Sequence, residues 1–455
     1  MKLNRSEFLG KVALGVTAVS SLGQVFAQTP GQKNSLIKKV TIVGAGLSGL
    51  YSAYLLKNAG YEVNVVEAKN RIGGRLLTVF DEDTQLAADL GGEWIQENHF
   101  TIKSLCKELG IELKTYPIMK DVLIGDNLIE SNLVKVNFET REIIKRVLSL
   151  YEKMSNEKKQ SLDKLDIYSF LKYQGVSESE LYLLDMKYSV LFGESIRTIS
   201  AEKAISAFEI HENGFPFQYK IQSGSERLID TLKNKLKGVS FIIADPVVSV
   251  EDADNIVKLK TKSGREIESD VCIFAIPSNQ LNTIKFSPDL PKDKKLALLQ
   301  LRMSRMTKAA VVYKGTDYLR DKLYVQGDGI FQSIYSNANK NKSLNKGILS
   351  VISTGDRSEV ISRISSENLN PFFKNNLDSI ELLSTLKLER IHLNVWQNEP
   401  FIEGATSVYS PGTYEVKSIL ARKHGRIHFA GEYLGNHNGT MEAALLSAIE
   451  TVNSL

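Results

Sequence analysis

Cysteine is scarce in this sequence of 455 residues, and its scarcity excludes two kinds of cross-link. Only Cys106 and Cys272 occur, far apart in the chain. Neither belongs to a group with the spacing of zinc ligands, and two such thiols do not make the framework of a disulfide-rich domain. We therefore expect no metal site, and a chain long enough to form two or three domains around ordinary hydrophobic cores.

An excess of charge of one sign is also missing. Lysine and arginine number 57 against 53 aspartates and glutamates, a formal net charge of +4, and the basic residues do not gather into one region. Nucleic-acid-binding proteins concentrate basic residues on one face. The sequence therefore argues against a nucleic-acid partner, while its hydrophobic content of 42% is typical of a globular protein.

Long hydrophobic runs are absent as well. The most apolar stretch, residues 9–25, is interrupted by glycine, serine and threonine. It is also shorter than the ~20 apolar residues that a membrane-spanning helix needs. We therefore expect no stable membrane span.

The same stretch has the features of an export signal. It follows a short basic start and precedes Val-Phe-Ala at 25–27, which resembles the small-x-small site of a signal peptidase. Residues 4–11, NRSEFLGK, resemble a twin-arginine signal with one of its two arginines. We predict a signal peptide at 1–27 and a linker at 28–35, and hence an exported, periplasmic or extracellular protein. The alternative is an uncleaved amphipathic N-terminus on a cytoplasmic protein.

A glycine-rich turn between two short strands is the first feature that points to a ligand. Residues 39–43 and 62–66 are β-branched runs, and apolar residues recur at helical spacing between them. The turn has the pattern G-x-G-x-x-G, with glycines at Gly44, Gly46 and Gly49. Such glycines allow a tight turn and the close approach of a pyrophosphate, and the helix N-terminus favours anions. The segment therefore predicts a βαβ unit that binds a dinucleotide.

The residues after the second strand distinguish FAD from NAD. Glu67 ends that strand, where a carboxylate accepts hydrogen bonds from a ribose diol. Arg71, Gly74 and Arg75 follow closely. A second glycine pair with arginines suits the wrapping of a pyrophosphate that already lies on a helix end, which favours FAD.

In the order Glu-x-x-x-Arg-x-Gly-Gly-Arg, residues 67–75 resemble the second signature of the flavin-containing amine oxidase family. That family includes monoamine, polyamine and L-amino-acid oxidases. The resemblance implies an α/β fold in which a Rossmann-like FAD-binding domain is interleaved with an α+β substrate domain. The FAD-binding domain is expected at 36–81, 217–285 and 391–455, and the substrate domain at 82–216 and 286–390.

Further motifs of the family follow in the same order. DLGGEWI at 89–95 resembles the loop beneath the flavin ring, Val247 the valine whose backbone contacts adenine, and Trp396 the tryptophan that lines the flavin. FAGE at 429–432 resembles the motif whose acid binds the ribityl chain, and GTMEAA at 439–444 the helix start at the pyrimidine end. Each match alone has an ordinary structural interpretation, and their joint order carries the assignment. The FAD-binding residues that the resemblance implies are Gly44, Gly46, Gly49, Glu67, Arg71, Gly74, Arg75, Gly92, Glu93, Trp94, Val247, Trp396, Gly431, Glu432, Thr440 and Met441.

Lys308 stands in an otherwise apolar run. Because residues two apart in a strand share a face, it should point with Ala310 and Val312. Taken alone, it is either a charge at a wet strand end or a buried amine with a chemical task. The segment KAAVVYK is similar to the one in which the family holds a lysine that hydrogen-bonds, through a water, to flavin N5. The resemblance makes Lys308 the candidate catalytic residue, because a cation there stabilises charge that develops on oxygen.

Two departures from the family bear on cofactor and substrate. Monoamine oxidases attach FAD to a cysteine, and the matching position here is Ala405, so we predict non-covalent FAD. Their two upright aromatic residues match Thr406 and Thr440, which become substrate-pocket candidates. Without a double-aromatic cage, a simple arylalkylamine is a poorer expectation. No arginine can be assigned to hold the carboxylate of an amino acid.

The resemblance implies an FAD-dependent oxidase of an amine or L-amino acid, with hydride transfer to flavin N5, hydrolysis of the imine, and reduction of O2 to H2O2. Its partners would be the small-molecule amine or amino acid and O2, and a homodimer is allowed for. One alternative is an FAD-dependent C–C desaturase or dehydrogenase, although such relatives do not generally use the lysine matched by Lys308. Another is a flavin-binding protein without turnover, against which the intact flavin motifs argue.

Overall fold

The computed structural model describes residues 37–117, 121–124, 127–130, 136–205, 217–315, 323–336, 345–381, 383–435 and 439–455. The predicted signal peptide at 1–27 and linker at 28–35 lie outside the described residues, as does the end of the predicted segment 82–216. Among the described helices, none has the length and apolar character to cross a membrane.

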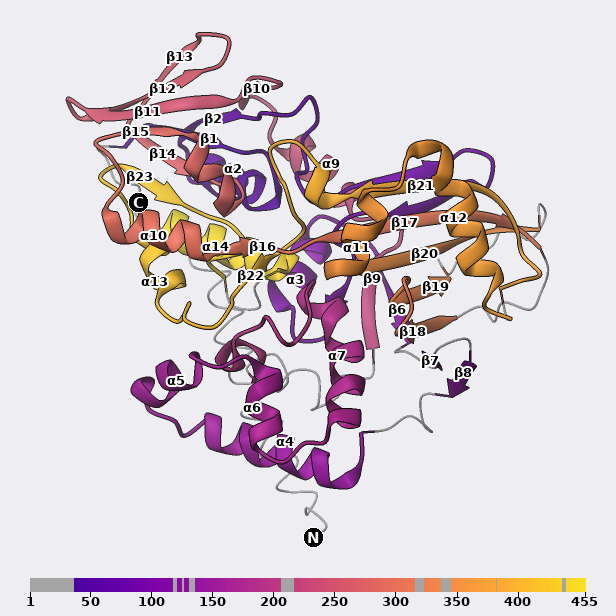
Figure 1. Cartoon of the computed structure of the whole chain (residues 1–455). Coiled ribbons are helices and arrows are strands. Elements are labelled where there is room, and N and C mark those ends of the chain that lie inside the picture. The colour runs from indigo at the N-terminus through magenta and orange to yellow at the C-terminus, as the bar shows by residue number, and fades with distance from the viewer. Residues whose placement is uncertain are drawn as a thin grey trace, which may run out of the picture.

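A five-stranded parallel sheet lies at the upper left of Figure 1. Its strands, in spatial order, are β10 (Ser240–Ile242), β2 (Glu62–Val66), β1 (Lys39–Val43), β14 (Val271–Phe274) and β23 (Ile427–Phe429). All four pairings are parallel, and every residue of β14 is buried. Because strands from three distant parts of the chain meet in one sheet, the predicted α/β fold with a Rossmann-like βαβ unit is confirmed.

Four of the described helices share one hydrophobic core with this sheet. They are α2 (Leu47–Asn58), which joins β1 to β2, α3 (Phe100–Glu108), α9 (Glu226–Lys235) and α14 (Met441–Asn453). The α3 side chains Ile102 and Leu105 are fully buried in this core. Helix α3 belongs to the segment predicted as substrate domain, so the division into two interleaved domains stays a prediction at this boundary.

A second, larger sheet lies to the right in Figure 1 and carries the candidate lysine. Its strands, in spatial order, are β21 (Lys387–Val395), β17 (Met306–Lys314), β20 (Lys346–Thr354), β19 (Ser333–Ser336), β18 (Tyr324–Gly327), β7 (Asp121–Ile124) and β8 (Asn127–Glu130). Ala309 and Val311 pack into one hydrophobic cluster, and Ala310 and Val312 into another. The alternation predicted for this strand is therefore confirmed, and Lys308, only 2% exposed, is a buried residue and not a strand-end charge.

Smaller sheets complete the described architecture. They contain β5 (Ile95–Gln96), β9 (Phe217–Ile221) and β6 (Leu113–Pro117); β13 (Glu266–Ser269), β12 (Ile256–Thr261), β11 (Val247–Ala253) and β15 (Lys285–Ser287); β3 (Thr78–Asp81) with β4 (Leu86–Asp89); and β16 (Arg302–Met303) with β22 (Ser407–Val408). The three-stranded sheet matters most for the site, because β9 pairs with both β5 and β6.

A group of helices occupies the bottom of Figure 1 and has its own core. They are α4 (Phe138–Tyr151), α5 (Asn156–Leu162), α6 (Ile167–Tyr173) and α7 (Glu178–Phe192). Ser177 caps α7 by accepting a hydrogen bond from the Glu180 amide at 3.3 Å. In a full capping box the Glu180 carboxylate would accept a hydrogen bond from the Ser177 amide. Here it accepts from the Asn137 amide at 2.9 Å and so joins α7 to the start of α4.

The remaining helices are short or lie at the edges of the sheets. They are α10 (Lys292–Gln300), α11 (Gly355–Ser362), α12 (Ser366–Asp378), α13 (Val416–Ala421), and the 3-10 helices Ser278–Thr283 and Trp396–Asn398. The second 3-10 helix follows β21 directly and begins with the predicted flavin-lining tryptophan.

Candidate active site

One cavity of about 850 Å³ connects the parallel sheet with the larger sheet and the helix group. It begins at the carboxyl ends of β1, β2 and β14, where ligands bind in open parallel sheets. Its size lies within the range of natural cofactor and ligand sites. Every predicted site residue lines this cavity except Gly49 and Arg71.

The glycine turn has the geometry that the sequence predicts. Gly44 has φ +103°, and a Cβ on it would lie 2.6 Å from the Ala275 carbonyl oxygen. A Cβ on Gly49 would lie 2.0 Å from the Gly44 carbonyl oxygen. Any side chain at Gly49 would therefore clash with the turn. Glycine at this position lets α2 approach the turn closely, which places the N-terminus of α2 at the cavity although Gly49 itself does not line it.

Replacing Gly49 with alanine is therefore expected to lower the affinity for FAD by about 5- to 150-fold, because the methyl group pushes α2 away from the turn at a cost of about 1–3 kcal/mol. Titration of the apoprotein with FAD, followed by flavin fluorescence, measures this. Gly329→Ala is the control, since a Cβ on Gly329 meets nothing within 4 Å. Equal affinities of the two variants would refute the role of Gly49.

The residues around this turn fit a pyrophosphate and a ribose. Helix α2 begins without a side-chain cap and without an acidic residue in its first turn, so its first amides favour an anion. Ser48 lines the cavity, and its buried Oγ has no hydrogen-bond partner among the described residues. Glu67 also lines the cavity, where its carboxylate accepts from the amides of Ala45 at 2.7 Å and Lys69 at 2.9 Å.

The two arginines of the second signature have different surroundings. The Arg71 guanidinium donates to the carbonyls of Gly74 at 2.7 Å and Leu76 at 3.3 Å, and so holds the second glycine turn from behind. Arg75 lines the cavity, and Nη1 donates to Glu432 at 2.7 Å and to the Ala405 carbonyl at 2.9 Å. A direct contact between Arg71 and the cofactor stays a prediction, whereas Arg75 is positioned for one.

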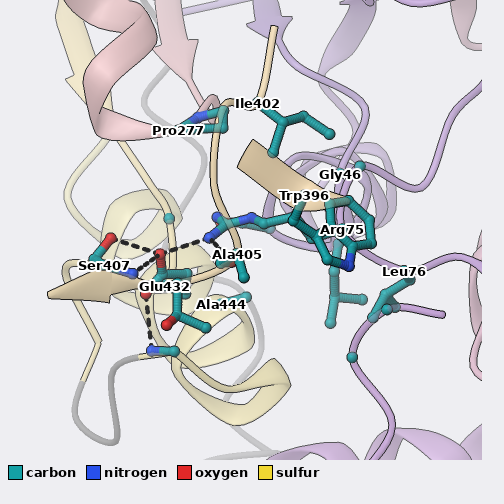
Figure 2. A pocket seen from close by; sticks show the side chains of 18 of the residues that line it. Gly46, Arg75, Leu76, Pro277, Trp396, Ile402, Ala405, Ser407, Glu432 and Ala444 are labelled. Atoms are coloured by element: carbon teal, nitrogen blue, oxygen red, sulfur yellow. Dashed lines mark hydrogen bonds and ion pairs between the residues drawn. The ribbon is translucent and has the colours of Figure 1, made fainter. Parts of the chain in front are cut away.

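Glu432 is the centre of a polar cluster that Figure 2 shows at close range. Besides Arg75, its Oε1 accepts from Ser407 Oγ at 2.6 Å, and its Oε2 accepts from the Gly439 amide at 2.8 Å. These bonds fix the carboxylate against the segment that leads into α14. The predicted cofactor residues Gly431, Glu432, Thr440 and Met441 all line this part of the cavity.

Trp396 and Ala405 form an apolar wall beside that cluster (Figure 2). Trp396 is 1% exposed, and its indole N–H donates to the Leu90 carbonyl at 2.8 Å. Its ring is thereby held against the loop that follows β4. Ala405 lines the cavity and offers no atom that could bond covalently to a flavin.

Thr406 and Thr440 both line the cavity, as predicted. Thr406 Oγ1 lies 2.9 Å from Ser304 Oγ, and Thr440 caps α14 by accepting from the Ala443 amide at 3.1 Å. Gly439, the residue before Thr440, lies close to Thr406, because a Cβ on Gly439 would lie 3.2 Å from Thr406 Cβ. The two threonines therefore lie near one another, with small polar side chains where the family resemblance placed an aromatic pair.

Lys308 reaches the cavity from β17 and meets the loop between β4 and β5. Its ammonium donates to the Gly91 carbonyl at 3.1 Å and forms an ion pair with Glu93 Oε2. Glu93 Oε1 forms a second ion pair with Lys220 on β9, and the Tyr335 hydroxyl donates to Oε2. Lys308 is therefore one member of a buried charged cluster that also contains Glu93 and Lys220.

The two lysines determine the ionisation of Glu93. Burial alone would raise the pKa of this carboxyl, but the ammonium groups of Lys220 and Lys308 lower it to about 2. Burial also lowers the pKa of Lys220, and the Glu93 carboxylate opposes that effect. We assign Lys220 the ammonium form because it forms an ion pair with an ionised carboxylate, and Lys308 forms a second ion pair with the same carboxylate.

A different set of residues lines the cavity on the side of the helix group. They are Lys187, Tyr188, Leu191 and Phe192 of α7, Ile199, Lys203, Tyr324 and Gln326 of β18, and Ile352 of β20. The Gln326 amide donates to the carbonyls of Met186 and Lys187 at 2.9 and 2.7 Å, which joins β18 to α7. This part is mainly apolar and aromatic, with lysines as its charged members.

Sequence reasoning missed Lys220, Tyr335 and the residues of α7. Lys220 alternates with Tyr219 and Ile221, a pattern typical of a strand with one wet face. Its partner Glu93 lies far away in the sequence. No local signal distinguishes this lysine from an exposed one, whereas Lys308 stood out against an apolar run.

Known proteins resemble this chain along most of its length. The model of the flavin-containing amine oxidoreductase family matches residues 47–455. An L-amino-acid oxidase of Bothrops moojeni is 23% identical over 92% of this chain and 89% of its own length. A probable flavin-containing monoamine oxidase A of Dictyostelium discoideum is 25% identical over 91% of this chain and 96% of its own length.

Solved structures show the same architecture. Cyclohexylamine oxidase from Brevibacterium oxydans superimposes with a TM-score of 0.79 at 19% identity, covering 92% of this chain and 98% of its own. A redesigned putrescine oxidase gives the same TM-score, identity and coverage. At these identities the structures establish the fold and leave the substrate open. The family match extends over most of the chain, so the protein belongs to the flavin-containing amine oxidoreductases.

Proposed function

We propose that this protein is an FAD-dependent oxidase that oxidises the C–N bond of a small amine or L-amino acid and passes the electrons to O2. The observation that carries the proposal is the buried Lys308 ammonium, which lines the cavity beside the Gly91–Glu93 loop. A fixed cation in a site shielded from water stabilises negative charge that develops on oxygen. A desaturase that only withdraws hydride from carbon gains nothing from such a group.

The cofactor would be held without a covalent bond. The amides at the start of α2 would hold its phosphates, Glu67 its ribose, and Arg75 with Glu432 its central part. Ala405 offers no nucleophile, and the two cysteines are buried in cores outside the cavity lining. When bound, the flavin would supply a hydride acceptor for the amine and a two-electron donor for O2.

The lining on the α7 side supports a substrate with a compact apolar group. Among the described lining residues, the carboxylates are Glu67, Glu93 and Glu432, none of them from α7, β18 or β20. A polyamine needs carboxylates for its distal ammonium groups, so we do not expect one as substrate. Lys203 is ion-paired with Glu202 at 3.1 Å, whereas Lys187 on the same side disfavours an ammonium nearby and is compatible with a carboxylate. The neutral amine should be the reacting form, and activity should rise with pH through the ionisation of the substrate.

A substrate panel tests this function. The FAD-loaded protein is mixed with cyclic and arylalkyl amines, polyamines, and apolar and charged L-amino acids, and both peroxide release and anaerobic bleaching of the flavin are followed. We expect bleaching by an apolar amine or apolar amino acid, peroxide formation when air is admitted, and no reaction with polyamines. Bleaching without peroxide would indicate a dehydrogenase, and a flavin that no nitrogen compound bleaches would refute the proposal.

A further inference from the structure

A second buried lysine, Lys220, stands behind the wall of the cavity. Glu93 uses one carboxylate oxygen for Lys220 and the other for Lys308. Glu93 and Lys308 line the cavity, and Lys220 is not among the lining residues. Lys220 can therefore influence a bound flavin or O2 only through its effect on Glu93 or through the electrostatic field of the Lys220 ammonium.

Aromatic rings enclose the Lys220 ammonium. Nζ lies 4.1 Å from the ring centroid of Trp94, 4.3 Å from that of Tyr335 and 4.4 Å from that of Tyr116. The rings come from three different elements, and those of Trp94 and Tyr335 also pack on each other at 5.2 Å. Such faces attract a cation. The site is therefore built around an ammonium group, although an apolar side chain would be simpler to bury at this place.

The charges of the cluster do not balance. Two ammonium groups share one carboxylate, which leaves one positive charge in excess. Asp89 is a further buried acid close to this cluster, and its Oδ1 accepts hydrogen bonds from Thr78 at 2.6 Å and from the Ser225 amide at 2.8 Å. It is not ion-paired with either lysine among the described contacts. Burial and the Glu93 carboxylate raise its pKa and the Lys308 ammonium lowers it, so each comparison below concerns the removal of one charge and not the absolute charge of the region.

We propose that Lys220 is a positioning residue that keeps Lys308 available as a cation. By occupying one oxygen of Glu93, it prevents this carboxylate from neutralising Lys308 completely, and the excess positive charge faces the cavity. When bound in its reduced form, the flavin would supply O2 with two electrons and its N5 proton, and a second proton from solvent would complete the formation of H2O2. The effect on this step rests on the proposed oxidase function, whereas the effect on the potential of the bound flavin does not.

Lys220→Met is expected to slow reoxidation of the reduced flavin by O2 about tenfold. The net charge of the cluster falls from +1 to zero, so the reduced, negatively charged flavin is also less favoured. The midpoint potential should become more negative by about 30 mV, which corresponds to a tenfold change for a two-electron couple. The potential is measured by slow enzymatic reduction against a reference dye, without any amine. Lys220→Gln makes the same charge change and can still donate to Glu93, and it serves if Lys220→Met does not retain FAD.

The double variant Glu93→Gln/Lys220→Met separates charge from packing. It removes one negative and one positive charge, so the cluster again carries +1. We expect its potential and its reoxidation rate to lie closer to those of the unmodified protein than the values of Lys220→Met do. If Lys220 only supported the packing of Trp94 and Tyr335, the double variant would be at least as impaired as Lys220→Met.

Lys294 provides a matched control. It is also buried, its Nζ lies 4.0 Å from the ring centroid of Phe429, and it donates to the Leu420 carbonyl at 2.8 Å, but it does not line the cavity. Lys294→Met should lower the melting temperature without changing potential or reoxidation. The proposal is overturned if Lys220→Met behaves in the same way.

The proposed function can fail independently of this role. If no amine or amino acid is oxidised but the potentials follow the charge of the cluster, Lys220 keeps its role and the oxidase assignment falls. If Lys308→Met slows reoxidation, and Lys220→Met alters neither the midpoint potential nor the reoxidation rate, the oxidase assignment stands and the proposed role of Lys220 is refuted.

Discussion

Replacing Lys308 with methionine is expected to slow the reaction of the reduced flavin with O2 by about 100-fold or more, because one preorganised charge-stabilising group is removed from a buried site. Methionine fills a similar volume on β17, and Glu93 retains Lys220 as its partner, so the variant should fold and bind FAD. Bleaching of the flavin by substrate should change much less. Stopped-flow mixing of the reduced protein with air-saturated buffer measures the reoxidation rate directly.

Lys314 offers a control on the same strand. It is exposed at the end of β17, and Lys314→Met should leave reoxidation unchanged. Lys308→Arg retains a cation and should keep a larger part of the rate than Lys308→Met. A reoxidation rate in Lys308→Met equal to that of the unmodified protein would favour a desaturase-like enzyme, for which O2 is not the acceptor.

The sequence predicts the cofactor half of the site well, because local geometry determines it. Gly44 is required by its positive φ and Gly49 by its contact with the Gly44 carbonyl, and Glu67 follows at the end of the next strand. The burial of Lys308 could also be predicted, since the alternation of a single strand places it on an apolar face. These features need only short-range rules and the order of motifs along the chain.

The rest of the site depends on contacts between distant segments. Lys220 becomes buried because β9 pairs with β5 and β6 and because Tyr335 arrives from β19. Helix α7 has apolar residues on most of its faces, so its sequence does not indicate that Leu191 and Phe192 turn toward the cavity. Glu93 was predicted as a cofactor residue from its motif, but its ion pairs with two lysines required knowledge of the tertiary structure.

Glu93 should also be the residue on which the stability of this region depends most. Replacing Glu93 with leucine leaves two ammonium groups buried without their carboxylate, and loss of one partner of a buried ion pair costs about 3–5 kcal/mol. Urea unfolding at pH 7, with and without bound FAD, measures this loss. The Glu93→Leu/Lys220→Met double variant should recover part of it, because one of the two uncompensated charges is then gone.

The pH dependence of the stability loss in Glu93→Leu identifies the electrostatic origin of that loss. The pKa of Glu93 falls from its ordinary value of 4.5 to about 2 on folding, so its ionised form stabilises the protein fully above about pH 4.5. This contribution is lost as the pH falls from 4.5 toward 2, and the gap in stability between the unmodified protein and Glu93→Leu should narrow over that range.

Glu442 is also buried, but it accepts from the neutral amides of Thr101 and Ile102, both at 2.9 Å. Glu442→Leu removes a helix cap and should cost only about 1–2 kcal/mol. If the loss of unfolding free energy in Glu93→Leu is no larger than in Glu442→Leu at every pH from 2 to 7, Glu93 contributes through packing and the lysines do not depend on its charge.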